Sequence, residues 1–306
     1  MIKGRALINF IVIILLACHA CRNSSGRKTE FVFPEADTIP VSEAEKLSTE
    51  AIEEIAKNIA SPVEIANLLQ SLAVPFSPDY LASSIDANKQ TTSFDKAFTL
   101  GILGADLGYL NMYEKTGSSI DILSSIRKLA EGLKVGQYFD FETIKRLSLS
   151  KSNLDSLLYI SIDSYTRIDS YLRDNDRGQL SALMIIGVWI EGQYLATQVM
   201  TEYPDPVLRD RIGEQKIILN DLLLLANPYC SRDTEFGELC RDLQSIKEKY
   251  RDIRITYTLG EPITREVDGA LVVEQTETSV VDMTEEQLAG IIEITKTIRN
   301  KLIANN

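Results

Sequence analysis

The residues best suited to chemistry in this chain are two acids, each followed three positions later by a tyrosine. Asp106 precedes Tyr109 in the segment GADLGYL, and Glu191 precedes Tyr194 in the segment WIEGQYL. Residues three positions apart lie on one face of a helix, so each acid points the same way as its tyrosine. Two carboxyl groups that flank a sugar in an open cleft perform glycosidase chemistry, which is the reaction this pair would suit.

Both segments lie in stretches that are apolar nearly all round, which predicts helices buried on every side. A charge in such a place is costly unless it is paired. Two interpretations are therefore open. In the preferred one, each acid accepts hydrogen bonds from a tyrosine hydroxyl or a backbone amide of a neighbouring helix. In the other, five side chains line one pocket: Asp106, Tyr109, Trp189, Glu191 and Tyr194.

The scarcity of histidine limits the possible catalytic mechanisms most, because the only histidine is His19. The folded part of the chain therefore lacks a Ser–His–Asp or Cys–His catalytic group, histidine-ligated zinc and the commonest general base near neutral pH. A glycine-rich phosphate loop is also missing from the sequence. We expect no metal and no cofactor, and we favour a binding or scaffold protein over an enzyme.

Helix patterns dominate the elements that must position these acids. Capping boxes begin at Ser42, Ser61 and Thr284, the last before a C-terminal helix with apolar residues at three- to four-residue spacing. Polar and Pro/Gly-rich breaks separate the other segments. The expected helices are 42–59, 62–72, 94–115, 118–134, 153–173, 179–202, 206–226 and 234–250. The sequence predicts an all-α bundle of packed α-hairpins.

The two central helices have features in common. Gly101, Gly104 and Gly108 would each cost about 1 kcal/mol relative to alanine inside a helix, so they predict a neighbouring backbone packed very close. The repeated acid-x-x-Tyr-Leu pattern, each time before a polar turn and a second helix, indicates an internal duplication of α-hairpins. Chance repetition in an apolar context is the alternative.

One region has the pattern of strands. Residues 254–258 and 271–276 alternate apolar and polar side chains and are rich in β-branched types, with glycine and proline between them. This predicts a small β-hairpin, near 254–277, inserted before the C-terminal helix.

Two cysteines, Cys230 and Cys240, flank a polar turn. In an oxidising compartment they would form a disulfide across that turn. Two buried free thiols are the alternative, and a metal-binding pair is less favoured than either.

The N-terminus has the features of a secretory signal peptide: basic residues, a short apolar run, and the sequence Leu-Leu-Ala before Cys18. A cysteine at this point resembles the lipobox of bacterial lipoproteins, in which it is lipidated and becomes the new N-terminus. Cys21 is the alternative, with a poorer match. The run is shorter than the ~20 residues that span a bilayer, so we expect a lipid anchor. Residues 1–17 would be the signal peptide, 18–40 a flexible tether and 41–306 one helical domain.

The net charge of the chain and the residues of the tether indicate which partners and which location to expect. The formal net charge is −12, which makes nucleic acid a poor partner. The residues after Cys18 are basic and do not include an aspartate beside the cysteine. Both features favour the periplasmic face of the outer membrane. We expect contact with the membrane through the lipid and with a protein or glycan partner.

The segments around Gly101–Tyr109 and Trp189–Ala196, together with the lipobox, resemble a group of helical lipoproteins from Bacteroidota. The similarity covers roughly residues 90–230. It implies a cell-envelope location and a helical fold, and it implies no mechanism. The leading hypothesis is a lipid-anchored, non-enzymatic envelope protein; the alternative is a glycan hydrolase or glycan-binding protein that uses Asp106 and Glu191.

Overall fold

The computed structural model describes residues 68–69, 71–148, 154–232, 234–260, 263–267, 270–274 and 277–304. These residues divide into two units, a helical unit within 68–255 and 281–304 and a β unit within 256–280. Cys18, Cys21, the predicted tether and the predicted helix 42–59 lie outside the described residues, as does most of the predicted helix 62–72.

The all-α prediction is confirmed. The described α-helices are α4 (Ser93–Met112), α5 (Thr116–Gly132), α6 (Phe141–Ser148), α7 (Leu154–Asp174), α8 (Gly178–Glu202), α9 (Pro206–Ala226), α10 (Thr234–Tyr250) and α11 (Glu285–Ala304). Three short 3-10 turns are η3 (Pro78–Tyr80), η4 (Gly136–Tyr138) and η5 (Asn227–Tyr229). The sequence did not predict α6, because eight residues hold too few turns for a periodicity to stand out.

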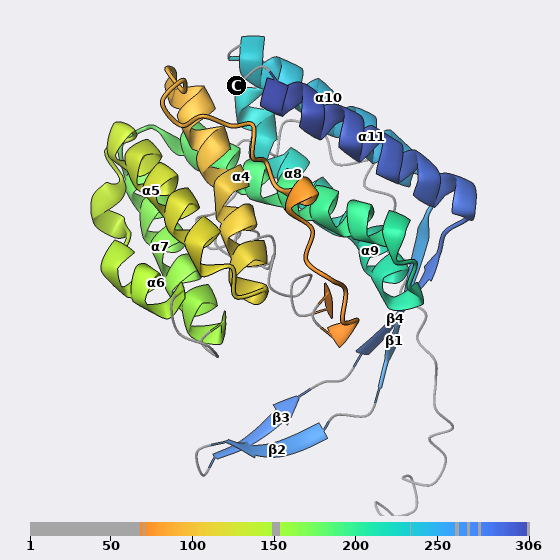
Figure 1. Cartoon of the computed structure of the whole chain (residues 1–306). Helices are drawn as coiled ribbons and strands as arrows, with labels where there is room; N and C mark the ends of the chain where they lie inside the picture. The colour runs from red at the N-terminus through yellow and green to blue at the C-terminus, as the bar shows by residue number, and fades with distance from the viewer. Residues whose placement is uncertain are drawn as a thin grey trace, which may run out of the picture. The chain divides into compact units, whose positions relative to one another are not determined.

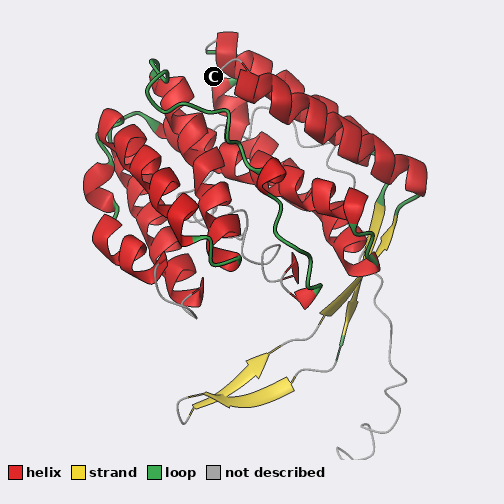
Figure 2. Cartoon of the chain, viewed as in Figure 1, coloured by secondary structure: helices red, strands yellow, loops and turns green. Residues whose placement is uncertain are grey.

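Helices α4 and α8 form the centre of the helical unit (Figure 1). Helices α5, α6 and α7 pack on one side of this pair, and α9, α10 and α11 pack on the other (Figure 2). Helix α8 is buried along almost its whole length, as its apolar circumference predicted. The segment before α4, which includes η3, also contacts α8.

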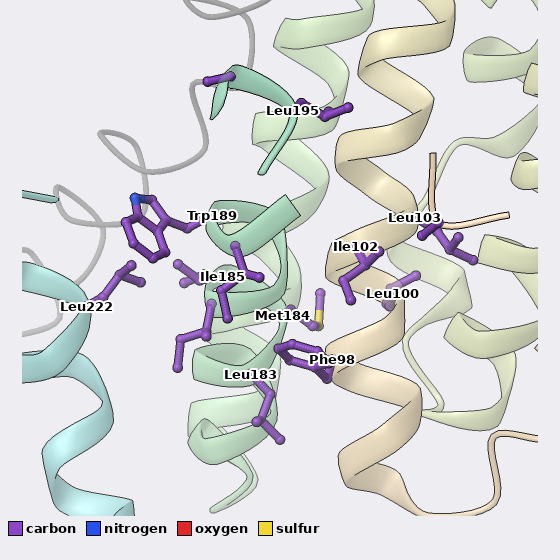
Figure 3. Packing of buried hydrophobic residues seen from close by; sticks show 14 of the residues in the cluster. Phe98, Leu100, Ile102, Leu103, Leu183, Met184, Ile185, Trp189, Leu195 and Leu222 are labelled. Carbon is purple, nitrogen blue, oxygen red and sulfur yellow. The ribbon is translucent and has the colours of Figure 1, made fainter. Parts of the chain in front are cut away.

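The backbones of α4 and α8 meet at Gly101 and Gly187. A β-carbon on Gly101 would lie 2.1 Å from the carbonyl oxygen of Met184, and one on Gly187 would lie 2.4 Å from the carbonyl oxygen of Phe98. Large apolar side chains surround this contact (Figure 3). The predicted close packing therefore holds at Gly101. It does not extend to Gly108, where a β-carbon would meet no atom within 4 Å.

Side-chain caps are present before α11 and α9. The Thr284 amide donates to Gln287 Oε1 at 2.7 Å and the Gln287 amide to Thr284 Oγ1 at 3.2 Å, which completes the predicted capping box before α11. Asp205 caps α9 in the predicted proline-rich break, where its Oδ1 accepts from the amides of the second and third helical residues at 2.8 and 3.1 Å.

A β-hairpin precedes α11 as predicted, but its strands pair differently. Strands β2 (Ile263–Val267) and β3 (Ala270–Glu274) are antiparallel partners, whereas β1 (Arg254–Leu259) pairs with β4 (Glu277–Asp282). The two segments predicted as partners, 254–258 and 271–276, are thus in separate strand pairs. Two residues separate β3 from β2 and two separate it from β4, and only the first pair, Asp268-Gly269, is a dipeptide favoured in two-residue hairpin turns. The local sequence therefore favours β2 as the partner of β3.

Cys230 and Cys240 are joined by a disulfide, with their Cα atoms 5.9 Å apart. The bond links the end of η5 to α10 and so fixes the connection between α9 and α10. By the chain-entropy estimate, a loop this short contributes about 2–3 kcal/mol to stability.

Candidate functional site

Asp106 lies on the buried face of α4 and has no exposed surface. Its Oδ2 accepts a hydrogen bond from the backbone amide of Ala82 at 2.9 Å. Among the residues that the structure describes, no N–H or hydroxyl group donates to its Oδ1. Asp106 therefore holds the segment that follows η3 against α4, with one oxygen left without such a donor.

Glu191 occupies the corresponding position on α8 and is also fully buried. Arg299 of α11 donates two hydrogen bonds to Glu191, from Nε to Oε2 at 2.8 Å and from Nη2 to Oε1 at 2.5 Å. The Arg299 side chain is only 7% exposed. This fork-to-fork pairing is the strongest geometry available to an arginine and a carboxylate.

Arg299 also connects other parts of the unit to this pair. Its Nη2 donates to the carbonyl oxygen of Tyr80 at 3.4 Å, and its guanidinium carbon lies 4.1 Å from the centroid of the Tyr194 ring. A guanidinium over an aromatic face is attracted by the negative face of the ring. One side chain of α11 thus contacts both α8 and η3.

The two acids lie close enough for a hydrogen bond between their carboxyl groups. Burial raises the pKa of Asp106 well above its ordinary value, and the neighbouring Glu191 charge raises it further. Burial also raises the pKa of Glu191, and the two hydrogen bonds from Arg299 oppose that rise. The difference in partners separates the two acids, because the arginine stabilises the ionised form of Glu191 directly.

Tyr109 and Trp189 point to other neighbours. The Tyr109 hydroxyl accepts from the Ser77 amide at 3.0 Å, and its ring contacts Phe76, Tyr80 and Tyr113. The Trp189 indole donates to Gln215 of α9 at 2.9 Å, and Figure 3 shows its ring directed toward Leu222. Positions 189 and 191 differ by about 200° around a helix, so Trp189 and Glu191 face opposite ways.

The expectation of one pocket lined by all five residues is therefore corrected. The structure brings together Asp106 and Glu191 and joins Tyr194 to them through Arg299. The preferred interpretation named a tyrosine hydroxyl or a backbone amide as the partner of each acid. Asp106 has a backbone amide, that of Ala82, on one of its two oxygens, whereas Glu191 has an arginine, which that interpretation did not include.

Arg299 is the residue that the sequence reasoning missed. It lies within the apolar stripe of α11, one position after Ile298 and four after the buried Thr295. A cation at a core-facing position of an amphipathic helix is costly unless it has an anionic partner. That position was the available sign that a buried acid elsewhere needed an arginine.

The chemistry open to this arrangement is narrow. Both carboxyl groups have no exposed surface, and both oxygens of Glu191 are occupied by Arg299. Glycoside hydrolysis requires two carboxyl groups on either side of a sugar, with room for the sugar between them. These two acids contact each other and the protein, so the geometry supports a structural network.

Helix α8 carries one more feature relevant to location. It is the described helix that is long and apolar enough to cross a membrane, and its whole apolar window is buried within the protein. It also carries the buried Glu191, which is paired with Arg299. These contacts are those of a core helix in a globular unit.

Metal ligands are not grouped in the part of the chain that the structure describes: no three His, Cys, Asp or Glu side chains there are close enough to hold a metal ion. Comparison with known proteins gives no match, whether with family models, curated proteins or solved structures.

Proposed function

We propose that this chain is a lipid-anchored protein of the cell envelope that acts by binding a protein or glycan partner, and not by catalysis. The observation that supports a non-catalytic role is that the two central acids are already bound by other residues of the protein. Asp106 and Glu191 are the best-placed carboxyl groups for catalysis, and both are fully buried in contact with Ala82, Arg299 and each other. A residue committed to such a network has no contact left for a substrate.

The anchor rests on the lipobox-like sequence that ends at Cys18, and the resemblance to Bacteroidota lipoproteins supports the same location. The periplasmic face of the outer membrane is the proposed site, on the grounds of the basic tether. A single acyl chain holds a protein at a membrane only weakly, and stable anchoring takes a second chain or another membrane-binding feature.

The anchor is tested by metabolic labelling with an alkyne fatty acid and by membrane fractionation of the full chain. We expect Cys18→Ala to remove the label and to release the protein from the membrane fraction. Cys21→Ala is the matched control and should keep both. Label that survives Cys18→Ala and disappears with Cys21→Ala would move the anchor to Cys21, and label that survives both changes would refute lipidation.

The non-catalytic role is tested by incubating the detergent-solubilised full chain with a panel of envelope glycans. We expect no release of reducing ends, and binding without turnover would identify a glycan as the partner. Turnover that disappears in both Asp106→Asn and Glu191→Gln proteins, with the fold intact by circular dichroism, would favour the hydrolase alternative instead.

A further inference from the structure

The buried network holds three ionisable side chains with unequal charge. Arg299 provides one positive charge, and both of its forked hydrogen bonds go to Glu191. If Asp106 were ionised as well, the network would carry a net negative charge at a place with no exposed surface. Burying an unpaired charge is strongly unfavourable even after the protein relaxes around it.

The hydrogen-bond pattern at Asp106 points the same way. An ionised carboxylate can only accept hydrogen bonds, and Oδ1 of Asp106 receives none from an N–H or hydroxyl group of the described residues. A protonated carboxyl group has one donor, and the carboxyl group of Glu191 lies within hydrogen-bond reach of Asp106. Protonation therefore supplies the missing bond and removes the extra charge together.

We propose that Asp106 and Glu191 share one proton at neutral pH, and that this proton is needed to hold the segment after η3 and helix α11 against the α4–α8 pair. The proton is bonded to Asp106, and the resulting hydroxyl group donates a hydrogen bond to the carboxylate of Glu191. The Ala82 amide binds the other oxygen of Asp106, and Arg299 binds Glu191. Loss of the proton places two carboxylates in contact, so the stability of the helical unit falls as pH rises.

Among the described residues, Glu202 and three tyrosines are the other titratable groups around this network, and the tyrosines carry no charge. The tyrosines are Tyr109 on α4, Tyr194 on α8 and Tyr80 on η3. Burial raises the pKa of Tyr109 to about 12 and also raises the pKa of Tyr194 and Tyr80, so all three are neutral at physiological pH. Glu202, at the end of α8, lies beside Tyr80 and Tyr109 and adds a further negative charge on that side.

The sign of the pH effect follows from the raised pKa of Asp106. The folded unit keeps the proton at pH values where the unfolded chain, with an aspartate pKa of about 3.9, has lost it. Stability is therefore fully present below the unfolded pKa and decreases as pH rises toward the folded pKa. The only histidine in the chain is His19, so few other side chains titrate between about pH 6 and pH 9 to obscure this slope.

The test compares urea unfolding of the full chain, in detergent, at several pH values for three proteins. For the unmodified protein we expect the folding equilibrium constant to fall by up to tenfold per pH unit, the limit for one proton, until the folded pKa is passed. Asp106→Asn keeps a neutral group of the same shape and should lose this slope. Asp169→Asn is the control, since Asp169 is another buried acid, paired with Arg173; it should keep the slope at lower stability.

A spectroscopic measurement decides the matter independently of whether the Asp106→Asn protein folds. Infrared spectra of the unmodified protein at pH 7 should contain a protonated-carboxyl stretching band that shifts when aspartate is labelled with carbon-13. Absence of that band would overturn the proposal. A pH slope that is equal in the unmodified and Asp106→Asn proteins would overturn it as well.

Discussion

The acid-x-x-Tyr segments of α4 and α8 have the same spacing, yet they hold different parts of the chain. On α4, Asp106 binds the Ala82 amide and Tyr109 binds the Ser77 amide, so this segment holds the chain that precedes the helix. On α8, Glu191 pairs with Arg299 and the Tyr194 ring lies under the same guanidinium, so this segment holds α11.

A repeated motif therefore sets the position of a side chain on its helix, whereas the residue that it contacts sets its protonation state. Gly101 lies against Met184 and Val188, and Asp106 lies beside Glu191, so α4 and α8 pass each other in the same direction. This arrangement brings equivalent positions of the two segments together, as a duplicated α-hairpin would. Arginine then reaches only one acid, which separates their pKa values.

The largest expected effect comes from removing the partner of the α8 segment. Arg299→Met leaves Glu191 as a buried acid without a cation, and we expect a loss of about 3–5 kcal/mol in the free energy of unfolding. Lys301→Met on the same helix is the control: Lys301 binds Asp242 at 2.8 Å but is 45% exposed. Its loss should cost no more than about 1 kcal/mol. Urea denaturation of both proteins makes the comparison, and equal losses would show that Arg299 behaves as a surface residue.

The next largest effect tests the close backbone contact between α4 and α8, the two helices that carry the acids. Gly101→Ala places a methyl group against the backbone of Met184 and Val188, which cannot move aside as a side chain can. We expect a loss of about 1–3 kcal/mol or more from overpacking.

Gly108→Ala on the same helix is the matched control, because its β-carbon would meet no atom within 4 Å. The higher helix propensity of alanine should raise stability there by about 0.5–1 kcal/mol. Thermal melts of the two variants should therefore shift in opposite directions. A Gly101→Ala protein as stable as the unmodified one would contradict the close backbone contact.

The smallest expected effects are the stability changes on replacing each of the two tyrosines by phenylalanine. Tyr109→Phe removes the acceptor of the Ser77 amide, and we expect it to cost about 1–2 kcal/mol. Tyr194→Phe retains the ring face that contacts Arg299, so it should change stability by less than about 0.5 kcal/mol. Chemical denaturation resolves this difference. A larger loss at Tyr194 than at Tyr109 would reverse the roles assigned to the two segments.

Local chemistry in the sequence was enough to predict most elements of the helical unit. The capping pair Thr284 and Gln287 and the apolar circumference of α8 are effects of neighbouring residues, and both are present in the structure. The short helix α6 and the strand partners in the β unit were not predicted. Eight residues carry little periodicity, and the alternation of side chains within a strand does not indicate which other strand it pairs with.

The central acids show where prediction from sequence reached its limit. The apolar residues around Asp106 and Glu191 were enough to predict that both acids lie on buried helices and need partners there, because a charge in apolar surroundings is costly unless it is paired. Their partners, Ala82 and Arg299, are seen only in the folded structure. Arg299 is 108 positions from Glu191, and contacts over such separations arise from helix packing, which no local pattern encodes. The protonation of each acid follows from those contacts, since the side nearest the arginine keeps the charge.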